Sequence, residues 1–169
     1  TEAGLPPGVL NIVPGGATVG EELVTNPITR LVTMTGSVRT GRHLYHLAAD
    51  NITAIRLELG GKAPLIVMED ADVDRAVECA LISCYVNCGQ VCTCNERMYV
   101  HEAVYDRFLE GFLAGSRKLK LGDPLQEDTD IGPKVSREEV DKLDAMAQQA
   151  VADGCQVAMG GKRPTGGMF

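Results

Sequence analysis

Hydrophobic residues along this chain follow two different spacings. Short runs rich in β-branched and apolar residues recur between longer segments whose apolar positions return every three or four residues. The short runs are typical of strands, and the longer segments are typical of amphipathic helices. Strands that alternate with helices are the units from which parallel sheets are built. The pattern therefore predicts an α/β fold with mostly parallel sheets.

The boundaries of these elements follow from the apolar runs and from the Gly and Pro residues between them. Strands are expected at residues 9–13, 30–34, 53–57, 63–68, 98–101 and 156–159. Helices are expected at residues 18–24, 38–49, from the 70–74 region to 88, at 104–119 and at 137–153. The run at 63–68 is apolar enough to predict a strand buried on both faces. Ser136 and Glu139 form a capping box that opens the last helix.

Composition and charge narrow the class of protein. The 169 residues are 44% hydrophobic and 23% charged, as in globular proteins, and their net charge is −7. With this acidic balance, no Trp, four Tyr and three Phe, a nucleic-acid partner is not expected. Apolar stretches stay well short of the roughly 20 residues that a membrane span needs. Without a basic segment before an apolar one, we also expect no signal peptide.

The cysteines and histidines allow three interpretations: a disulfide scaffold, a zinc site, or reduced thiols without a metal. The six cysteines are too few for a secreted disulfide scaffold, and Cys92 and Cys94 are too close for an unstrained bridge. A zinc site is the second interpretation, but the sequence lacks a further Cys/His pair at ligand spacing to complete four ligands. His43 and His46, three residues apart in a helical stretch, are expected to be surface or packing residues. We therefore expect no metal, reduced thiols and a cytoplasmic location.

Three motifs contain residues of the types that bind phosphate or take part in catalysis. Gly36-Ser37 and Gly41 lie between a predicted strand and a predicted helix, where backbone N–H groups and the helix dipole attract phosphate. Glu58 ends a predicted strand, where partial burial would raise its pKa and favour a general base. Cys92 follows a predicted helix in a loop of small and polar residues, as a nucleophilic thiol would. Taken singly, each motif has a structural alternative: a tight turn, a solvated glutamate and a small buried thiol.

Four motifs together identify a family. Leu5-Pro6-Pro7-Gly8-Val9-Leu10-Asn11, Met34-Thr35-Gly36-Ser37, Glu58-Leu59-Gly60-Gly61-Lys62 and Gly89-Gln90-Val91-Cys92 occur in this order. Their order and spacing resemble the NAD(P)-dependent aldehyde dehydrogenase superfamily over nearly the whole chain. Details of the second and fourth motifs are most similar to the lactaldehyde/glycolaldehyde dehydrogenase branch.

The resemblance implies a reaction. Cys92 would attack the aldehyde carbonyl to give a thiohemiacetal, and hydride transfer to NAD, or NADP, would leave a thioester. Glu58 would activate the water that hydrolyses this thioester to the carboxylic acid. The backbone N–H of Cys92 would donate to the oxyanion. Cys94 is interpreted as a packing residue.

The resemblance also implies the cofactor site and the domain organisation. Gly36, Ser37 and Gly41 would lie against the pyrophosphate, Leu59 near the nicotinamide, and Gly16 in a turn near the adenine. Residues 1–59 would form the C-terminal part of a cofactor-binding domain, and residues 60–169 the N-terminal part of a catalytic domain. The fold would then comprise parts of two αβα domains, truncated at both ends.

Because family elements that complete both sites are missing, the isolated chain is expected to bind NAD poorly and to turn over little. The full-length protein is expected to be a homodimer or homotetramer acting on a small aldehyde, with no membrane partner. Two alternatives stay open: acylation of coenzyme A, against which Glu58 argues, and a non-catalytic dinucleotide-binding relative. The resemblance leaves the identity of the aldehyde and the choice between NAD and NADP open.

Overall fold

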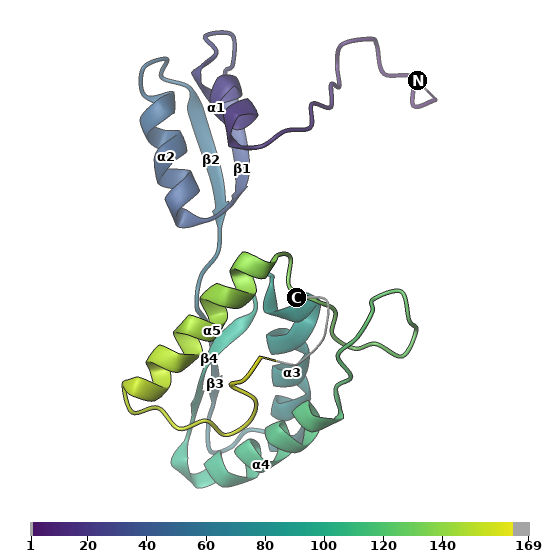
Figure 1. Ribbon diagram of the computed structural model, residues 1–169, viewed down its shortest axis with the longest axis vertical. Coiled ribbons are helices and arrows are strands. Elements are labelled where there is room, and N and C mark those ends of the chain that lie inside the picture. The colour runs from purple at the N-terminus through teal and green to yellow at the C-terminus, as the bar shows by residue number, and fades with distance from the viewer. Residues whose placement is uncertain (1, 164–169) are drawn as a thin grey trace. The chain divides into compact units, whose positions relative to one another are not determined.

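The computed structural model describes residues 2–163 (Figure 1). The chain divides into two compact units, with the boundary between Gly60 and Gly61. Each unit is built on one pair of parallel strands: β1 with β2 in the first unit, and β3 with β4 in the second. The assignment of these parts to a cofactor-binding and a catalytic domain stays a prediction.

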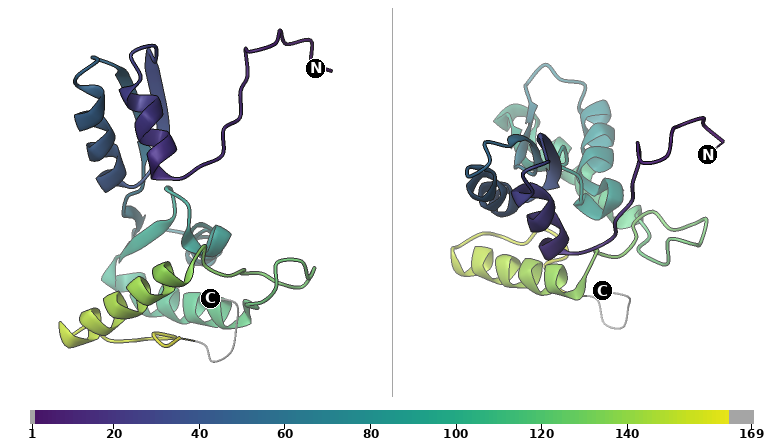
Figure 2. Two further views of the ribbon diagram at one scale, coloured as in Figure 1. Left: turned by 45° about the horizontal axis from the view of Figure 1, so that its top comes forward. Right: turned by 90° about the horizontal axis from the view of Figure 1, so that it is seen from above.

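The first unit begins with an irregular segment that leads into its helices and strands (Figure 2). Its elements are α1 (Ala17–Thr25), β1 (Leu31–Gly36), α2 (Val38–Ala48) and β2 (Ala54–Leu59). Helix α2 connects the two parallel strands, which is the crossover that a parallel pair requires. The helices observed are those expected from the apolar spacing, to within one or two residues at each end.

The core of the first unit lies between the helices and one face of the strand pair. Val24 of α1 and Leu44 and Ala48 of α2 are buried against Val32, Met34, Leu47 and Ile55. Alternate residues of β1 and β2 point away from this core and are exposed. Period-two alternation therefore places one face of each strand in the core, as it does in a half-covered sheet.

The second unit repeats the strand–helix–strand arrangement. Its elements are β3 (Ala63–Val67), α3 (Val73–Tyr85), the short 3₁₀ helix η1 (Val86–Gly89), β4 (Asn95–Val100), α4 (Glu102–Lys118) and α5 (Arg137–Ala152). Asp72 caps α3 by accepting a hydrogen bond from the N–H of Arg75 at 3.2 Å. The chain between α4 and α5 is an irregular loop in every view (Figure 2).

Helices α3 and α4 pack closely beneath β3 and β4. Val67, Val73, Ala80 and Phe108 form the buried core. Phe112 stacks on Phe108, with ring centroids 6.0 Å apart, and on the ring of Tyr85 at 5.9 Å. Two glycines of α4 allow the helices to approach, because a Cβ on Gly111 or Gly115 would crowd Val77 or Leu81. This packing holds the start of the segment that leads from α3 to Cys92.

The cap of α5 is formed by one half of the expected capping box. The hydroxyl of Ser136 accepts from the N–H of Glu139 at 3.3 Å. The Glu139 carboxylate instead contacts Lys142 Nζ at 3.1 Å. The pKa of the Glu138 carboxyl is lowered by its own backbone N–H and by Ser136. Polar and acidic residues at this N-terminus therefore satisfy its free N–H groups, as in other helices.

Two expected strands are wrong. Residues 9–13 and 156–159 have strand-like composition, but the described structure contains neither strand. A strand is stabilised by hydrogen bonds to a neighbour, and each described sheet has only two strands. The expected burial of strand 63–68 on both faces is also wrong: Val67 is 2% exposed but Ile66 is 65% exposed. Within the described residues, helices cover β3 on one face only.

The expected fold class is confirmed: the chain is α/β with parallel strand pairs. Within residues 2–163, no helix has the length and apolar character needed to cross a membrane.

Candidate active site

The carboxyl ends of β1 and β2 bring two of the predicted motifs together. In the parallel register Thr35 pairs with Glu58, and Gly36 pairs with Leu59. Residues 23 positions apart, in separate motifs, therefore become neighbours at one sheet edge. In open parallel sheets, ligands bind outside the carboxyl ends of the strands. This edge is the candidate cofactor site of the first unit.

The turn after β1 has the form of an anion-binding helix N-terminus. Ser37 is the N-cap of α2, and its Oγ accepts from the N–H of Thr40 at 3.1 Å. Its hydroxyl also lies 2.9 Å from the hydroxyl of Thr40. The N–H groups of the first helical turn and the helix dipole favour a negative group here. Arg39, an exposed cation on the same turn, adds to this preference.

Gly41 has a packing role in the structure. It is buried on α2, and a Cβ built on it would stand 2.8 Å from Leu57 Cδ1 and 3.2 Å from Leu59 Cδ2. The glycine thus lets α2 approach β2 closely. This is a different use of a glycine from direct backbone contact with phosphate, and both uses occur in dinucleotide-binding turns. Gly41 therefore supports the turn from behind by helix–strand packing.

Gly16 is the N-cap of α1, and because it has no side chain, it leaves the first N–H groups of the helix without a side-chain cap. Helices α1 and α2 run in the same direction, because Glu21 Oε1 lies 2.7 Å from His43 Nε2 and the Asn51 side chain reaches Thr25 O at the other end. The N-termini at Gly16 and Ser37 consequently face the same end of the unit. This is the end at which β1 and β2 terminate.

Glu58 is exposed at the end of β2. The partial burial expected for it is therefore wrong for the described chain. The reason is the pattern of β2: Leu57 and Leu59 face α2, and Glu58 lies between them on the opposite face, which the described helices of the first unit do not cover. Glu58 belongs to the first unit, and Cys92 belongs to the second.

Cys92 lies at the tip of a turn between η1 and β4. The N–H of Cys94 donates to the carbonyl of Val91 at 3.0 Å, which closes a β-turn with Cys92 and Thr93 at its centre. Both central residues are exposed, whereas Cys94 is 3% exposed and its Sγ lies 3.7 Å from Val86 O. The turn therefore presents the first thiol outward and packs the second inward, in agreement with the interpretation of Cys94 as a packing residue.

A left-handed segment immediately precedes this turn, and sequence reasoning missed it. Asn87, Cys88 and Gly89 have φ values of 49°, 58° and 73°. Left-handed backbone costs a non-glycine residue roughly 1–2 kcal/mol, and Asn tolerates it better than Cys. Such strain persists when surrounding contacts enforce it, and it concentrates at functional sites. The only sequence signal is Gly89, whose position after the apolar run also fits the end of a helix.

The six cysteines are free thiols in different environments. Cys79, Cys92 and Cys155 are exposed, and Cys84 and Cys88 are half-buried. Burial raises the pKa of the Cys84 thiol, and neighbouring Cys94 and Glu96 raise it further. Cys84 is therefore kept in its unreactive, protonated form. Among residues 2–163, no three His, Cys, Asp or Glu side chains gather as a metal site would require.

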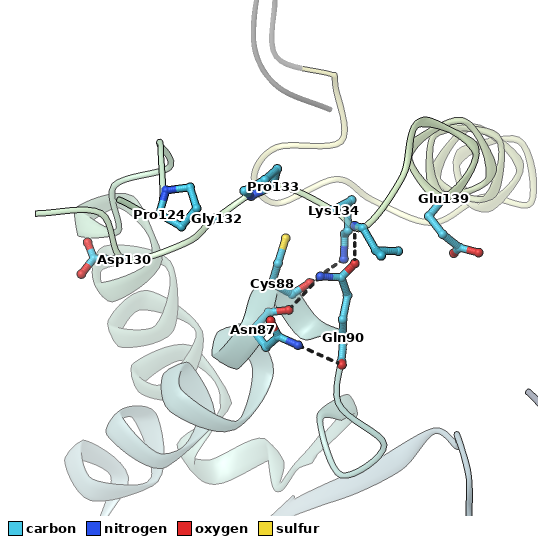
Figure 3. A pocket seen from close by; sticks show the side chains of 10 residues that line it. Asn87, Cys88, Gln90, Pro124, Asp130, Gly132, Pro133, Lys134 and Glu139 are labelled. Atoms are coloured by element: carbon cyan, nitrogen blue, oxygen red, sulfur yellow. Dashed lines mark hydrogen bonds between the residues drawn. The ribbon is translucent and has the colours of Figure 1, made fainter. Parts of the chain in front are cut away.

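Two hollows of about 780 Å³ and about 760 Å³ lie beside the left-handed segment in the second unit. Cys88, Gln90, Lys134 and Glu139 line both of them. Figure 3 shows the Lys134 side chain reaching from the loop before α5 to Cys88, and the Gln90 side chain extending from the turn toward that loop. Cys92 lines neither hollow. Sequence reasoning did not single out Lys134, because its partner lies 46 residues away in the chain.

Comparison with known proteins identifies the family. Residues 1–169 match the group described as the aldehyde dehydrogenase family, and the chain belongs to it. It is 50% identical over 169 residues to 3,6-anhydro-alpha-L-galactose dehydrogenase of Vibrio sp. (strain EJY3), covering 99% of this chain and 35% of the relative. It is 44% identical over 167 residues to lactaldehyde dehydrogenase of Escherichia coli (strain K12), covering 98% and 35%.

Solved structures agree with the sequence relatives. The structure of 3,6-anhydro-L-galactose dehydrogenase in complex with NADP matches with a TM-score of 0.94 and 49% identity, over 99% of this chain and 35% of that chain. Lactaldehyde dehydrogenase from Escherichia coli matches with a TM-score of 0.95 and 42% identity, over 98% and 35%. The chain therefore spans about a third of the length of the relatives it matches.

Proposed function

We propose that the full-length protein containing this chain oxidises a small aldehyde to a carboxylic acid, with NAD or NADP as hydride acceptor. One observation carries the proposal: Cys92 stands exposed at the tip of a β-turn, next to a left-handed segment. Membership in the aldehyde dehydrogenase family supports the same reaction. The NADP complex of a relative supports the cofactor class.

The first unit fits a dinucleotide. Ser37 and the first turn of α2 would hold the pyrophosphate, because they offer N–H groups and the positive end of a helix dipole. Gly36 would let the backbone come close to the phosphates, and Leu59 would lie near the nicotinamide. Gly16 would lie toward the adenine, at the start of the parallel helix α1. When bound, the cofactor supplies an acceptor for the hydride.

In the second unit, Cys92 would do the covalent chemistry. Its Sγ would add to the aldehyde carbonyl and form a thiohemiacetal. The backbone N–H of Cys92 would donate to the oxyanion that develops. Loss of a hydride from carbon would leave a thioester on Sγ. Glu58 would then take a proton from water, so that hydroxide attacks the thioester and releases the acid and the free thiol.

The substrate is proposed only as a class. Relatives carry names that refer to lactaldehyde, succinate semialdehyde, glutarate semialdehyde and an anhydrogalactose. Motif details favour lactaldehyde or glycolaldehyde as the first candidates. By family resemblance, we also propose a cytoplasmic homodimer or homotetramer. A panel of these aldehydes, each with NAD and with NADP, would rank the full-length protein's preferences by kcat/KM.

The nucleophile is tested by Cys92→Ser in the full-length protein, with reduced cofactor followed at 340 nm. Turnover should fall at least about 10³-fold, because a serine hydroxyl is a far weaker nucleophile than a thiolate at neutral pH. Cys79→Ser, which changes another exposed thiol on α3, should retain the wild-type rate. Undiminished turnover in Cys92→Ser with native circular dichroism would refute the assignment.

A further inference from the structure

Hydrogen bonds between two residues of the same loop, Asn87 and Gln90, join the two ends of the left-handed segment before Cys92 (Figure 3). Gln90 Nε2 donates to Asn87 O at 3.1 Å, and Asn87 Nδ2 donates to Gln90 O at 3.3 Å. The backbone N–H of Gln90 also donates to Asn87 O at 3.1 Å. Three hydrogen bonds therefore join the same two residues across Cys88 and Gly89.

A second set of contacts reaches this segment from the loop before α5. Lys134 Nζ donates to the carbonyl of Cys88 at 2.5 Å, and the N–H of Val135 donates to Gln90 Oε1 at 2.7 Å. Gln90 thus uses its amide nitrogen inside the turn and its amide oxygen toward the distant loop. Its side chain joins the two sets of contacts into one network, which we call the Lys134–Gln90 clamp.

The charge of Lys134 is directed at a backbone carbonyl. Within residues 2–163, no carboxylate lies within 4.0 Å of its Nζ. A hydrogen bond from a charged donor is stronger than one between neutral groups, and partial burial strengthens it further. Its acceptor belongs to Cys88, whose φ is 58°. If Cys88 relaxed to an ordinary backbone conformation, its carbonyl would turn and this bond would be lost.

We propose that Lys134 and Gln90 are positioning residues for the Cys92 thiol, a role that rests on the proposed function of Cys92 as nucleophile. The Val91–Cys94 turn begins directly after Gln90. The backbone conformation of the left-handed segment therefore sets the orientation of this turn, and with it the direction of the Cys92 side chain. The clamp stabilises this otherwise unfavourable backbone. A small misplacement of a reacting atom is enough to slow catalysis by about a hundredfold.

The test compares three variants of the full-length enzyme. Lys134→Met removes the ammonium and keeps the length of the side chain, Lys134→Arg keeps a charged donor, and Gln90→Met removes both amide contacts. Lys120→Met is the matched control, since Lys120 Nζ pairs with Asp128 in the exposed loop after α4. For each variant, kcat, the KM for cofactor and the hydrogen exchange of residues 87–94 are measured.

Lys134→Met and Gln90→Met should lower kcat about tenfold or more, because the thiol is misdirected, while the KM for cofactor stays within about twofold. Exchange at residues 87–94 should be faster, and Lys134→Arg should recover most of both properties. Lys120→Met should match the wild type. A Lys134→Met variant with wild-type kcat, or a loss that Lys134→Arg does not recover, would overturn the proposal.

The exchange measurement separates this proposal from the proposed function. Hydrogen exchange can be measured without turnover. If the wild-type enzyme oxidised no aldehyde, the proposed function would be wrong, but the exchange rates of the variants would still test the Lys134–Gln90 clamp. Unchanged exchange at residues 87–94 in both Lys134→Met and Gln90→Met would show that the clamp does not hold the turn. If Lys134→Met failed to fold, Gln90→Met and Lys134→Arg would decide the question by the same criteria.

Discussion

Gly41 of α2 lies directly against Leu57 of β2, so that a Cβ on the glycine would stand 2.8 Å from Leu57 Cδ1. The same Cβ would stand 3.2 Å from Leu59 Cδ2. Leu59 is in turn the register partner of Gly36, at the carboxyl end of β1. One close helix–strand contact therefore connects both ends of the Gly36–Gly41 motif to the strand that carries Glu58.

Gly41→Ala should destabilise the full-length protein by about 1–3 kcal/mol, the usual range for forcing extra volume into a packed site. Thermal denaturation would measure it as a lower Tm. Gly20→Ala is the control, because Gly20 lies inside α1 with nothing within 4 Å of its Cβ position. That substitution should leave Tm unchanged or raise it, since Ala favours helix over Gly. Equal effects of the two substitutions would contradict the packing role.

Ser37→Asp should weaken cofactor binding without loss of the α2 cap. Asp accepts the same N-cap hydrogen bond that Ser37 Oγ accepts from the N–H of Thr40. Its carboxylate, however, would repel the pyrophosphate, and about 1.4 kcal/mol of repulsion raises the Kd about tenfold. Titration calorimetry with NAD and NADP would measure the change. Ser37→Asn, a neutral cap, should bind nearly as the wild type does, and equal affinities of Asp and Asn variants would place the pyrophosphate elsewhere.

Thiol labelling should follow the exposure of the cysteines and the pKa of Cys84. At pH 7.5, N-ethylmaleimide should modify Cys79 and Cys92 before Cys84, as mass spectrometry of peptides would show. Because the pKa of Cys84 is raised, its thiolate should remain scarce at the ordinary thiol pKa of about 8.5. Its labelling rate should thus keep rising at higher pH, after the rate of a free thiol such as N-acetylcysteine has levelled off. Cys84 labelling that levels off together with the free thiol would contradict the raised pKa.

Glu58→Gln should separate acylation from hydrolysis in the full-length enzyme. Reduced cofactor should form in a rapid burst equal to the number of active sites, because Cys92 is intact. The later steady rate should fall about 10²–10⁴-fold, the usual contribution of a general base. Glu22→Gln, on α1 of the same unit, is the control and should behave as the wild type does. A steady rate near the wild-type value would exclude Glu58 as the base.

The isolated 169-residue chain should bind NAD poorly and show little or no turnover. It spans 35% of the length of its relatives, so most of each relative has no counterpart in it. Purified chain, assayed at 340 nm with the aldehyde panel beside the full-length protein, would test this. A rate above about one hundredth of the full-length value would contradict it.

Helix positions were predictable because they depend on local periodicity. Each expected helix is present to within a few residues at its ends, since an apolar stripe at helical spacing is visible in a short window. The strands at residues 9–13 and 156–159 failed because a strand also needs a partner. Val9 and Val157 are β-branched residues in suitable runs, but they are exposed in the described chain.

The candidate site was predictable in its residue types and less so in its geometry. Cys92 and Glu58 stood out through their motifs, and both are exposed in the described chain. The expected burial of Glu58 failed, because alternation placed it on the open face of β2. Lys134 gave no local signal, since its role consists of a hydrogen bond to Cys88 across 46 residues.

The sequence by itself determined the kinds of elements, the order and spacing of the motifs, and the candidates Cys92 and Glu58. These properties depend on side-chain chemistry and on periodicity within a few turns of chain. Only the tertiary structure decided that Gly36 lies beside Leu59, that Gly41 is a packing glycine, and that Lys134 donates a hydrogen bond to Cys88. Each of these depends on two distant segments meeting in one register, and short-range pattern carries no record of which segments meet.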